Sequence, residues 1–136
     1  MISLYYERRH NVVMTKVTGV LSSDDLDAHD LSVLLFLAGL MAGEKPVRGL
    51  YDFSGVVALA VPASRINQRG QRPAIIEGQR VVVAPPGAAG AEWVARLAEQ
   101  RRSAGLRLAT VVATLEEAYR VLGLDNPQFE RADPAL

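Results

Sequence analysis

Apolar residues recur at every second position near the start of the chain. Ile2, Leu4 and Tyr6 alternate with more polar neighbours, and the same period returns over residues 12–17. This period is typical of a half-buried β-strand. Because Arg-His-Asn at residues 9–11 can turn the chain between the two segments, the pattern predicts a β-hairpin.

A helix start follows the hairpin. Ser22 and Asp25 stand at the spacing of a capping box, and acidic side chains favour the positive end of a helix dipole. We expect a helix from about residue 24 to about residue 42, with Leu26 and Leu31 facing the core. The same pattern turns two acidic residues outward, Asp27 and Asp30.

The second half of this helix, residues 33–42, carries no polar side chain. A helix that is apolar on all sides must be covered on more than one side. The segment is too short to cross a bilayer, which takes about 20 residues. Three interpretations stay open: a helix of the core, a dimer face, or the wall of an apolar ligand groove.

Strands and helices alternate over the rest of the chain. Val47 to Phe53 predicts a strand that Ser54 and Gly55 end, and Pro62 suits the first turn of a helix. That helix would carry three arginines on one face before a proline ends it: Arg65, Arg69 and Arg72. The later segments predict a strand at 80–84, a helix at 89–104, a strand at 106–112 and a helix at 114–122.

Alternating strands and helices favour a largely parallel sheet with helices on its faces. The expected order is β-β-α-β-α-β-α-β-α, with about five strands and about four helices. The initial hairpin adds one antiparallel strand, so the sheet is mixed. We expect one α/β domain over residues 1–123 and a mobile tail over residues 124–136. Within this tail, Phe129 can dock on the domain.

Composition excludes several classes of function. The chain has 136 residues, nearly half of them apolar, and a formal net charge of zero. This length suits one domain with its own core, and the absence of a basic excess argues against nucleic acid as a partner. Without cysteine there is no disulfide, thiolate nucleophile or cysteine-ligated metal. Because the amino terminus lacks a signal-peptide pattern, we expect a cytoplasmic location.

Four segments resemble, in the same order, motifs of small bacterial SpoIIAA-like proteins. They are VTGVLSSDDL, YDFSGV, RVVVAPP and ATLEEAYRVLG. These proteins are related to the STAS domain of anti-sigma factor antagonists and are also grouped with the lipid-binding SEC14 domains. The resemblance covers about residues 2–123. It implies a STAS-like fold and an interaction module that often self-associates, with no established reaction.

The resemblance also bears on a regulatory serine. In the antagonists, a motif of the Asp-Ser-Ser-Gly type begins the next helix, and the partner kinase phosphorylates its serine. The matching stretch here, about residues 58–63, has no serine, aspartate or glycine, and Ser64 comes about two residues late. The resemblance therefore implies a protein without the phosphoserine switch. We expect Asp52 or Ser54 to accept a local backbone hydrogen bond instead.

No motif for catalysis or metal binding is evident in the sequence. His10 and His29 lie on different expected elements and lack metal-ligand spacing. Ser54, His29 and Asp52 include the residue types of a hydrolytic triad, but no G-x-S-x-G motif supports one. We therefore expect no enzyme activity, no cofactor and no metal.

Two functions agree with these observations. The first is a non-catalytic interaction or signalling module that forms a homodimer, the commonest closed assembly. The second is a carrier or sensor of a fatty-acid-like or lipid-like ligand, peripheral to the membrane, with the ligand between the first helix and the 56–61 connection. The expected ligand or dimer surface consists of Leu34, Leu37, Leu40, Met41, Val57, Leu59 and Val61. Arg65 and Arg69 are the expected contacts for an anionic headgroup.

Overall fold

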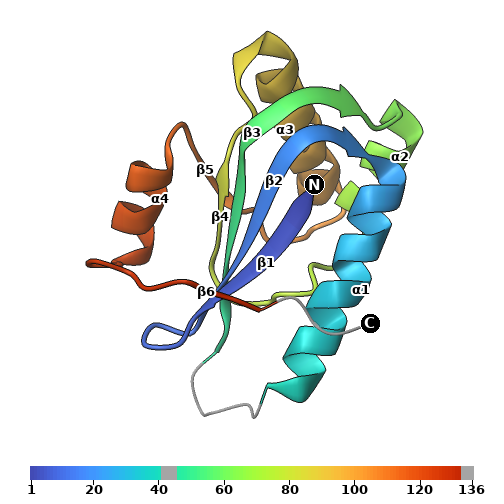
Figure 1. Ribbon diagram of the computed structural model, residues 1–136. Helices are drawn as coiled ribbons and strands as arrows, with labels where there is room; N and C mark the ends of the chain where they lie inside the picture. Colours follow the sequence, from blue (N-terminus) through green and yellow to red (C-terminus); the bar gives the residue numbers. More distant parts are fainter. Residues whose placement is uncertain (41–45, 133–136) are drawn as a thin grey trace.

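The computed structural model describes residues 1–40 and 46–132, which form an α/β fold of six strands and four helices (Figure 1). In chain order the elements are β1 Ile2–Glu7, β2 Val12–Ser22, α1 Ser23–Gly39, β3 Arg48–Ala60, α2 Ala63–Gly70, β4 Arg80–Val83, α3 Gly87–Ser103, β5 Thr110–Val112, α4 Leu115–Leu122 and β6 Glu130–Arg131. The predicted alternation of strands and helices is confirmed, and β6 extends it by one short strand.

The strands form one mixed sheet in the order β5-β4-β3-β2-β1-β6. The four strands β2, β3, β4 and β5 run parallel to one another, while β1 is antiparallel to both β2 and β6. The predicted hairpin is confirmed, with Ile2 opposite Val17 and Glu7 opposite Val12. Asn11 lies in the turn with a φ of 56°, a conformation that asparagine tolerates.

The helices cover the two faces of the sheet unequally, as Figure 1 shows. Helix α4 lies alone on one face, where Ala118 and Leu122 pack against Leu50 and Val81. Helices α1, α2 and α3 lie on the other face, so that face holds two further apolar clusters. Because three helices share this face, the space between them is the natural place for a cavity.

Helix α1 begins at the predicted capping box. The Ser22 hydroxyl accepts a hydrogen bond from the Asp25 N–H at 3.2 Å, and the Asp25 carboxylate accepts one from the Ser22 N–H at 3.3 Å. The helix ends at Gly39, earlier than predicted, and residues 41–45 lie outside the described part of the chain. Within the described residues, no helix combines the length and the apolar character needed to span a bilayer.

The buried face of α1 differs from the prediction. Leu26, His29 and Val33 are buried, whereas Leu31 is 53% exposed. Successive helical residues are about 100° apart, so a residue five positions after Leu26 lies about 140° away from it. Asp30, expected to face solvent, is half-buried because it lies four positions after Leu26 and three before Val33, beside the buried face of the helix.

Strand β3 is longer than predicted. It does not end at Ser54 and Gly55 but continues beside β2 to Ala60. Lys16 pairs with Asp52 and Thr18 pairs with Gly55, so the ladder contains a β-bulge at this point. A Cβ atom at position 55 would lie 2.9 Å from the Thr18 side chain, which explains the glycine there. The expected loop at 56–61 is therefore mostly strand.

Residues 124–132, which we expected to be mobile, pack against the domain. Leu124 is buried in the apolar cluster under α4, and the Phe129 ring stacks on Tyr119 with 6.0 Å between ring centroids. Glu130 and Arg131 then pair with β1 as β6. At the opposite edge, β5 is shorter than the strand predicted for residues 106–112.

Candidate functional site

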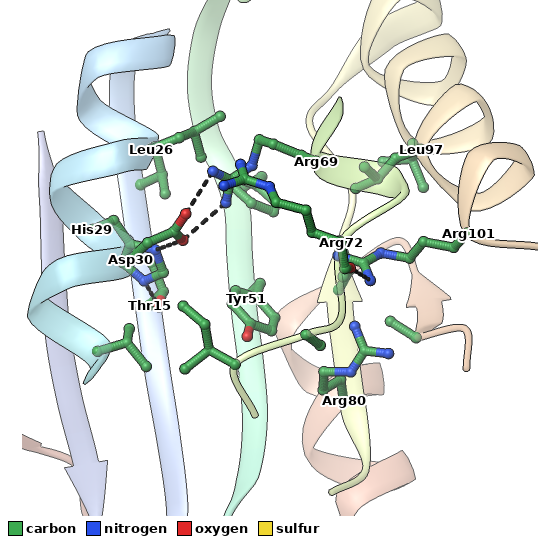
Figure 2. Close-up of a pocket in the computed structure, with 18 of the residues that line it drawn as sticks. Thr15, Leu26, His29, Asp30, Tyr51, Arg69, Arg72, Arg80, Leu97 and Arg101 are labelled. Carbon is green, nitrogen blue, oxygen red and sulfur yellow. Dashed lines mark hydrogen bonds and ion pairs between the residues drawn. The ribbon is translucent and has the colours of Figure 1, made fainter. Parts of the chain in front are cut away.

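A cavity of about 320 Å³ lies on the face of the sheet that α1, α2 and α3 cover. Its floor comes from β2, β3 and β4, and its two side walls come from α1 and α3 (Figure 2). The segment between α2 and β4 borders it through residues 72–75. We call this cavity the central pocket.

Helical spacing places the apolar walls of the central pocket. On α1, Leu26 and Val33 are seven residues apart and line the cavity together with Leu34. On α3, Trp93 and Leu97 are four residues apart and point from the same side of their helix. The Trp93 ring also contacts Phe53 edge to face, with centroids 5.3 Å apart. Most of the pocket surface is therefore hydrophobic.

A polar group lies on the α1 side of the central pocket. The His29 Nε2 and Thr15 Oγ1 atoms are 2.5 Å apart, and His29 Nδ1 lies 3.7 Å from an Asp30 oxygen. The Arg69 guanidinium donates two hydrogen bonds to the Asp30 carboxylate, at 2.7 and 2.9 Å. This fork joins α2 to α1 across one side of the pocket (Figure 2).

Asp30 is held in its charged form. Burial raises the pKa of its carboxyl, but the interactions with the nearby His29 ring and with the Arg69 guanidinium outweigh that effect. The net result is a pKa of about 2, well below the usual range. The Asp30–Arg69 pair therefore stays ionised at neutral pH, and its two charges largely cancel.

A second polar group lies on the α3 side of the central pocket. Arg80 begins β4 and Arg101 lies in the last turn of α3, and their guanidinium groups point toward one another (Figure 2). Arg80 donates to the Arg107 carbonyl at 2.6 Å, and Arg101 donates to the Arg72 carbonyl at 3.1 Å. Across residues 1–40 and 46–132, no carboxylate forms an ion pair with Arg80 or Arg101.

Tyr51 lies on the pocket floor between these two polar groups (Figure 2). Burial raises the pKa of its hydroxyl, and the nearby Arg80 charge offsets only part of that rise. The hydroxyl is therefore a neutral donor at physiological pH. In the described part of the chain it has no hydrogen-bond partner.

The apolar residues predicted for a ligand or dimer surface do not gather at one place. Of the seven, Leu34 lines the central pocket, and Leu37 packs in the cluster around Val33. Leu59 and Val61 pack against the core on the three-helix face, while Val57 is 79% exposed. Leu40 is half-buried after the end of α1, and Met41 lies outside the described residues. Residues 56–61 do not line the pocket, because they continue β3 instead of folding over α1.

The two predicted anion contacts are already paired with carboxylates. Arg65 donates to Asp27 at 3.1 Å near the surface, and Arg69 donates to Asp30. Only Arg69 lines the central pocket. Arg65 and Arg69 lie on α2 as predicted, where acidic residues of α1 pair with them, but the prediction was wrong for Arg72, which lies beyond the end of the helix at Gly70.

Sequence reasoning missed Tyr51, Arg80 and Arg101 as pocket residues. One signal for Arg80 exists, since a charged residue directly before an all-apolar strand must lie near the edge of buried structure. Arg101 follows Trp93 and Leu97 at intervals of four, which places it on the same face of α3. No local pattern indicates that these two side chains meet.

The stretch around Ser54 forms a local hydrogen-bonded structure. An Asp52 oxygen accepts from the Ser54 N–H at 3.0 Å and from the Ser54 hydroxyl at 2.6 Å. The expected local backbone hydrogen bond at Asp52 is confirmed, although it lies within β3 and does not end the strand. Ser64 is exposed in the first turn of α2.

Neither a scan against protein-family models nor a search of curated proteins gave a match for this chain. Within the described residues, no group of three or more His, Cys, Asp or Glu side chains could hold a metal ion.

Proposed function

We propose that the protein is a non-catalytic carrier or sensor that binds a small apolar ligand in the central pocket. The observation that carries this proposal is the cavity of about 320 Å³ with a mainly hydrophobic lining. Ligand sites are typically cavities of about 300–1,000 Å³, lined by apolar side chains with a few placed polar groups. Tyr51, Arg80 and Arg101 are such polar groups.

The polar groups of the pocket favour binding over proton-transfer chemistry. A general base works best when its pKa is near the working pH. The pKa of Asp30 is instead about 2, and its oxygens accept from Arg69. His29 is engaged with Thr15, so neither side chain is poised to take a proton from a ligand.

We expect Ala98→Trp to reduce binding of a neutral apolar probe at least tenfold. Ala98 lines the central pocket from α3, so a tryptophan there fills space that a ligand would use. Ala95 lies one turn earlier on the same helix, is exposed and does not line the pocket. Ala95→Trp is therefore the matched control, because it makes the same change in helix propensity.

The measurement is a fluorescence titration with N-phenyl-1-naphthylamine, alongside urea unfolding of each variant. Wild type and Ala95→Trp should bind the probe with similar affinity, and all three proteins should remain folded. No binding to wild type, or equal binding to the folded Ala98→Trp variant, would contradict the proposal.

We propose a second function, self-association as an interaction module, on the basis of a different surface. The outer side of α1 exposes Leu31, Leu34 and Leu35, at 53%, 52% and 43%. Exposed leucines on adjacent turns of one helix form an apolar patch, and such patches mark interaction sites. The resemblance to SpoIIAA-like proteins supports the same proposal.

We expect the protein to be a dimer at micromolar concentration, and Leu31→Lys with Leu35→Lys to convert it to a monomer. Two charges in the centre of an apolar interface would be buried without partners. Val121→Lys places one lysine on α4, on the opposite face of the sheet, and should leave the dimer intact. Light scattering gives the masses, and a monomeric wild type would rule out this second function.

A further inference from the structure

We propose that the central pocket selects an amphipathic anion, whose acidic group binds between Arg80, Arg101 and Tyr51 while its apolar body lies along the walls of α1 and α3. This inference rests on the proposed ligand-binding function and adds the chemical class of the ligand. The acidic group is a carboxylate or a phosphate monoester, because the same donors recognise both.

The charges that line the pocket do not balance. Among the residues that the structure describes, four arginines line it, Arg69, Arg72, Arg80 and Arg101, against one acidic residue, Asp30. Arg69 and Asp30 form a two-point ion pair and cancel each other. The excess of positive charge therefore lies on the α3 side, beside Tyr51 (Figure 2).

Arg80 is buried and Arg101 is half-buried, and among residues 1–40 and 46–132 neither has a carboxylate as a counter-charge. Arg80 is 8% exposed, and its guanidinium donates to a carbonyl oxygen, which satisfies one hydrogen bond but not the charge. Arg101 is half-buried and does the same with the Arg72 carbonyl. Burial lowers the pKa of both guanidinium groups, and the charge of Arg80 lowers that of Arg101 further. Buried charges are normally paired, so an anion from outside the chain would remove this cost.

The donors of the α3 side suit the oxygens of an acid group. A guanidinium presents several N–H donors in a planar fork that matches carboxylate and phosphate geometry. The Tyr51 hydroxyl adds a third, neutral donor from the floor of the pocket. On the α1 side, the charges of Asp30 and Arg69 cancel, so that side offers an anion no net attraction, and the acid group of the ligand lies on the α3 side. Its apolar part then lies toward Leu26, Val33 and Leu97.

The decisive experiment compares ligands that share one apolar chain and differ in charge. Isothermal titration of the wild type with octanoate, octyl phosphate, 1-octanol and octylamine separates the acid group from the chain. We expect at least one of the two anions to bind ten times or more tighter than 1-octanol, and octylamine to bind worst. The anion that binds with the higher affinity identifies which acid group the site prefers.

Two variants test the residues. Arg80→Met and Arg101→Met should each weaken binding of the preferred anion about 10- to 100-fold, because each removes a charge-assisted hydrogen bond. Their affinity for 1-octanol should stay within about threefold of wild type, since methionine keeps the apolar stem. Arg102→Met is the matched control, because Arg102 is exposed, follows Arg101 in α3 and does not line the pocket.

Thermal unfolding without ligand gives an independent readout. If Arg80 serves to bind an anion, Arg80→Met should leave the melting temperature of the ligand-free protein unchanged or raise it, because the substitution removes an unpaired buried charge. A purely structural arginine would lower it. The anion should raise the melting temperature of the wild type and not that of Arg80→Met.

The outcomes separate the two proposals. If 1-octanol and the neutral fluorescent probe bind as tightly as the anions, the proposed function stands and the anion inference is wrong. If neither the anions nor the neutral ligands bind, the proposed function fails, and the inference fails with it. An equal loss of anion binding in Arg102→Met and Arg101→Met would indicate a general effect of net charge and would contradict the proposed anion site. Should Arg80→Met not fold, Arg101→Met gives the same test, because Arg101 is only half-buried and lies in the last turn of α3.

Discussion

Replacing Leu50 by alanine should lower the free energy of unfolding by about 2–5 kcal/mol, the range for leucine removed from a packed core. Leu50 is 0% exposed on the central strand β3. Its side chain packs with Val12, Val81 and Leu122 in the cluster beneath α4. Sheet and helix both surround it, so the structure can collapse only partly into the space that alanine leaves.

Urea unfolding measures this loss, and a ligand titration shows where it acts. Leu50 faces α4, on the opposite side of the sheet from the central pocket. The folded Leu50→Ala protein should therefore bind the preferred ligand with nearly wild-type affinity. Val57→Ala is the control, because Val57 is on the same strand but 79% exposed, and its change should stay within about 0.5 kcal/mol. A loss below 1 kcal/mol for Leu50→Ala would contradict the packing described for this face.

The strands and helices followed from local patterns because each of their signals lies within a few residues. The capping box at Ser22 and Asp25 fixes the start of α1 and was read directly. The hairpin of β1 and β2 followed from alternation, and the all-apolar β4 from its lack of alternation. These features need only the chain's own periodicity.

The length of β3 could not be predicted, because a partner strand decides it. After Ser54 and Gly55, two residues that favour turns, the strand continues because β2 continues beside it through residue 22. A β-bulge accommodates the extra residue of β3 between Asp52 and Gly55. The Asp52 carboxylate accepts a hydrogen bond from the Ser54 N–H, which has no partner in the ladder at the bulge. The predicted local hydrogen bond at Asp52 is present, but pairing with β2 determines where β3 ends.

In the candidate site, too, local sequence patterns predicted some features, while tertiary packing determined the others. Sequence placed Arg69 on a helix and Leu34 on α1, but the groove expected beside residues 56–61 was wrong, because those residues extend the sheet. Arg80 and Arg101 are distant in sequence, and their guanidinium groups come near one another only through the folded arrangement of β4 and α3 (Figure 2). Contacts of this kind depend on how the helices pack on the sheet, and the hydrophobic periodicity of a single segment does not predict that packing.

Replacing Gly90 by alanine should lower the free energy of unfolding by about 1–3 kcal/mol, the range for an overpacked site. Gly90 lies in the first turn of α3 and is buried against Pro85, two residues after the end of β4. A Cβ atom there would stand 2.7 Å from the Pro85 carbonyl carbon and closer still to its oxygen. These are backbone atoms, which cannot rotate away, so α3 itself must shift.

A shift of α3 should also change the central pocket, which distinguishes this variant from Leu50→Ala. Helix α3 carries Trp93, Leu97 and Arg101 on the wall of the cavity, so its displacement moves the apolar lining and one guanidinium together. We expect Gly90→Ala to lose both stability in urea and affinity for the preferred anion, the latter about tenfold, because misplacing a charged hydrogen bond removes much of its strength. Gly39→Ala is the control: a Cβ at position 39, the end of α1, would meet nothing within 4 Å, so stability should be unchanged or slightly higher. Wild-type stability and wild-type affinity in Gly90→Ala would together show that α3 does not depend on close approach to the end of β4.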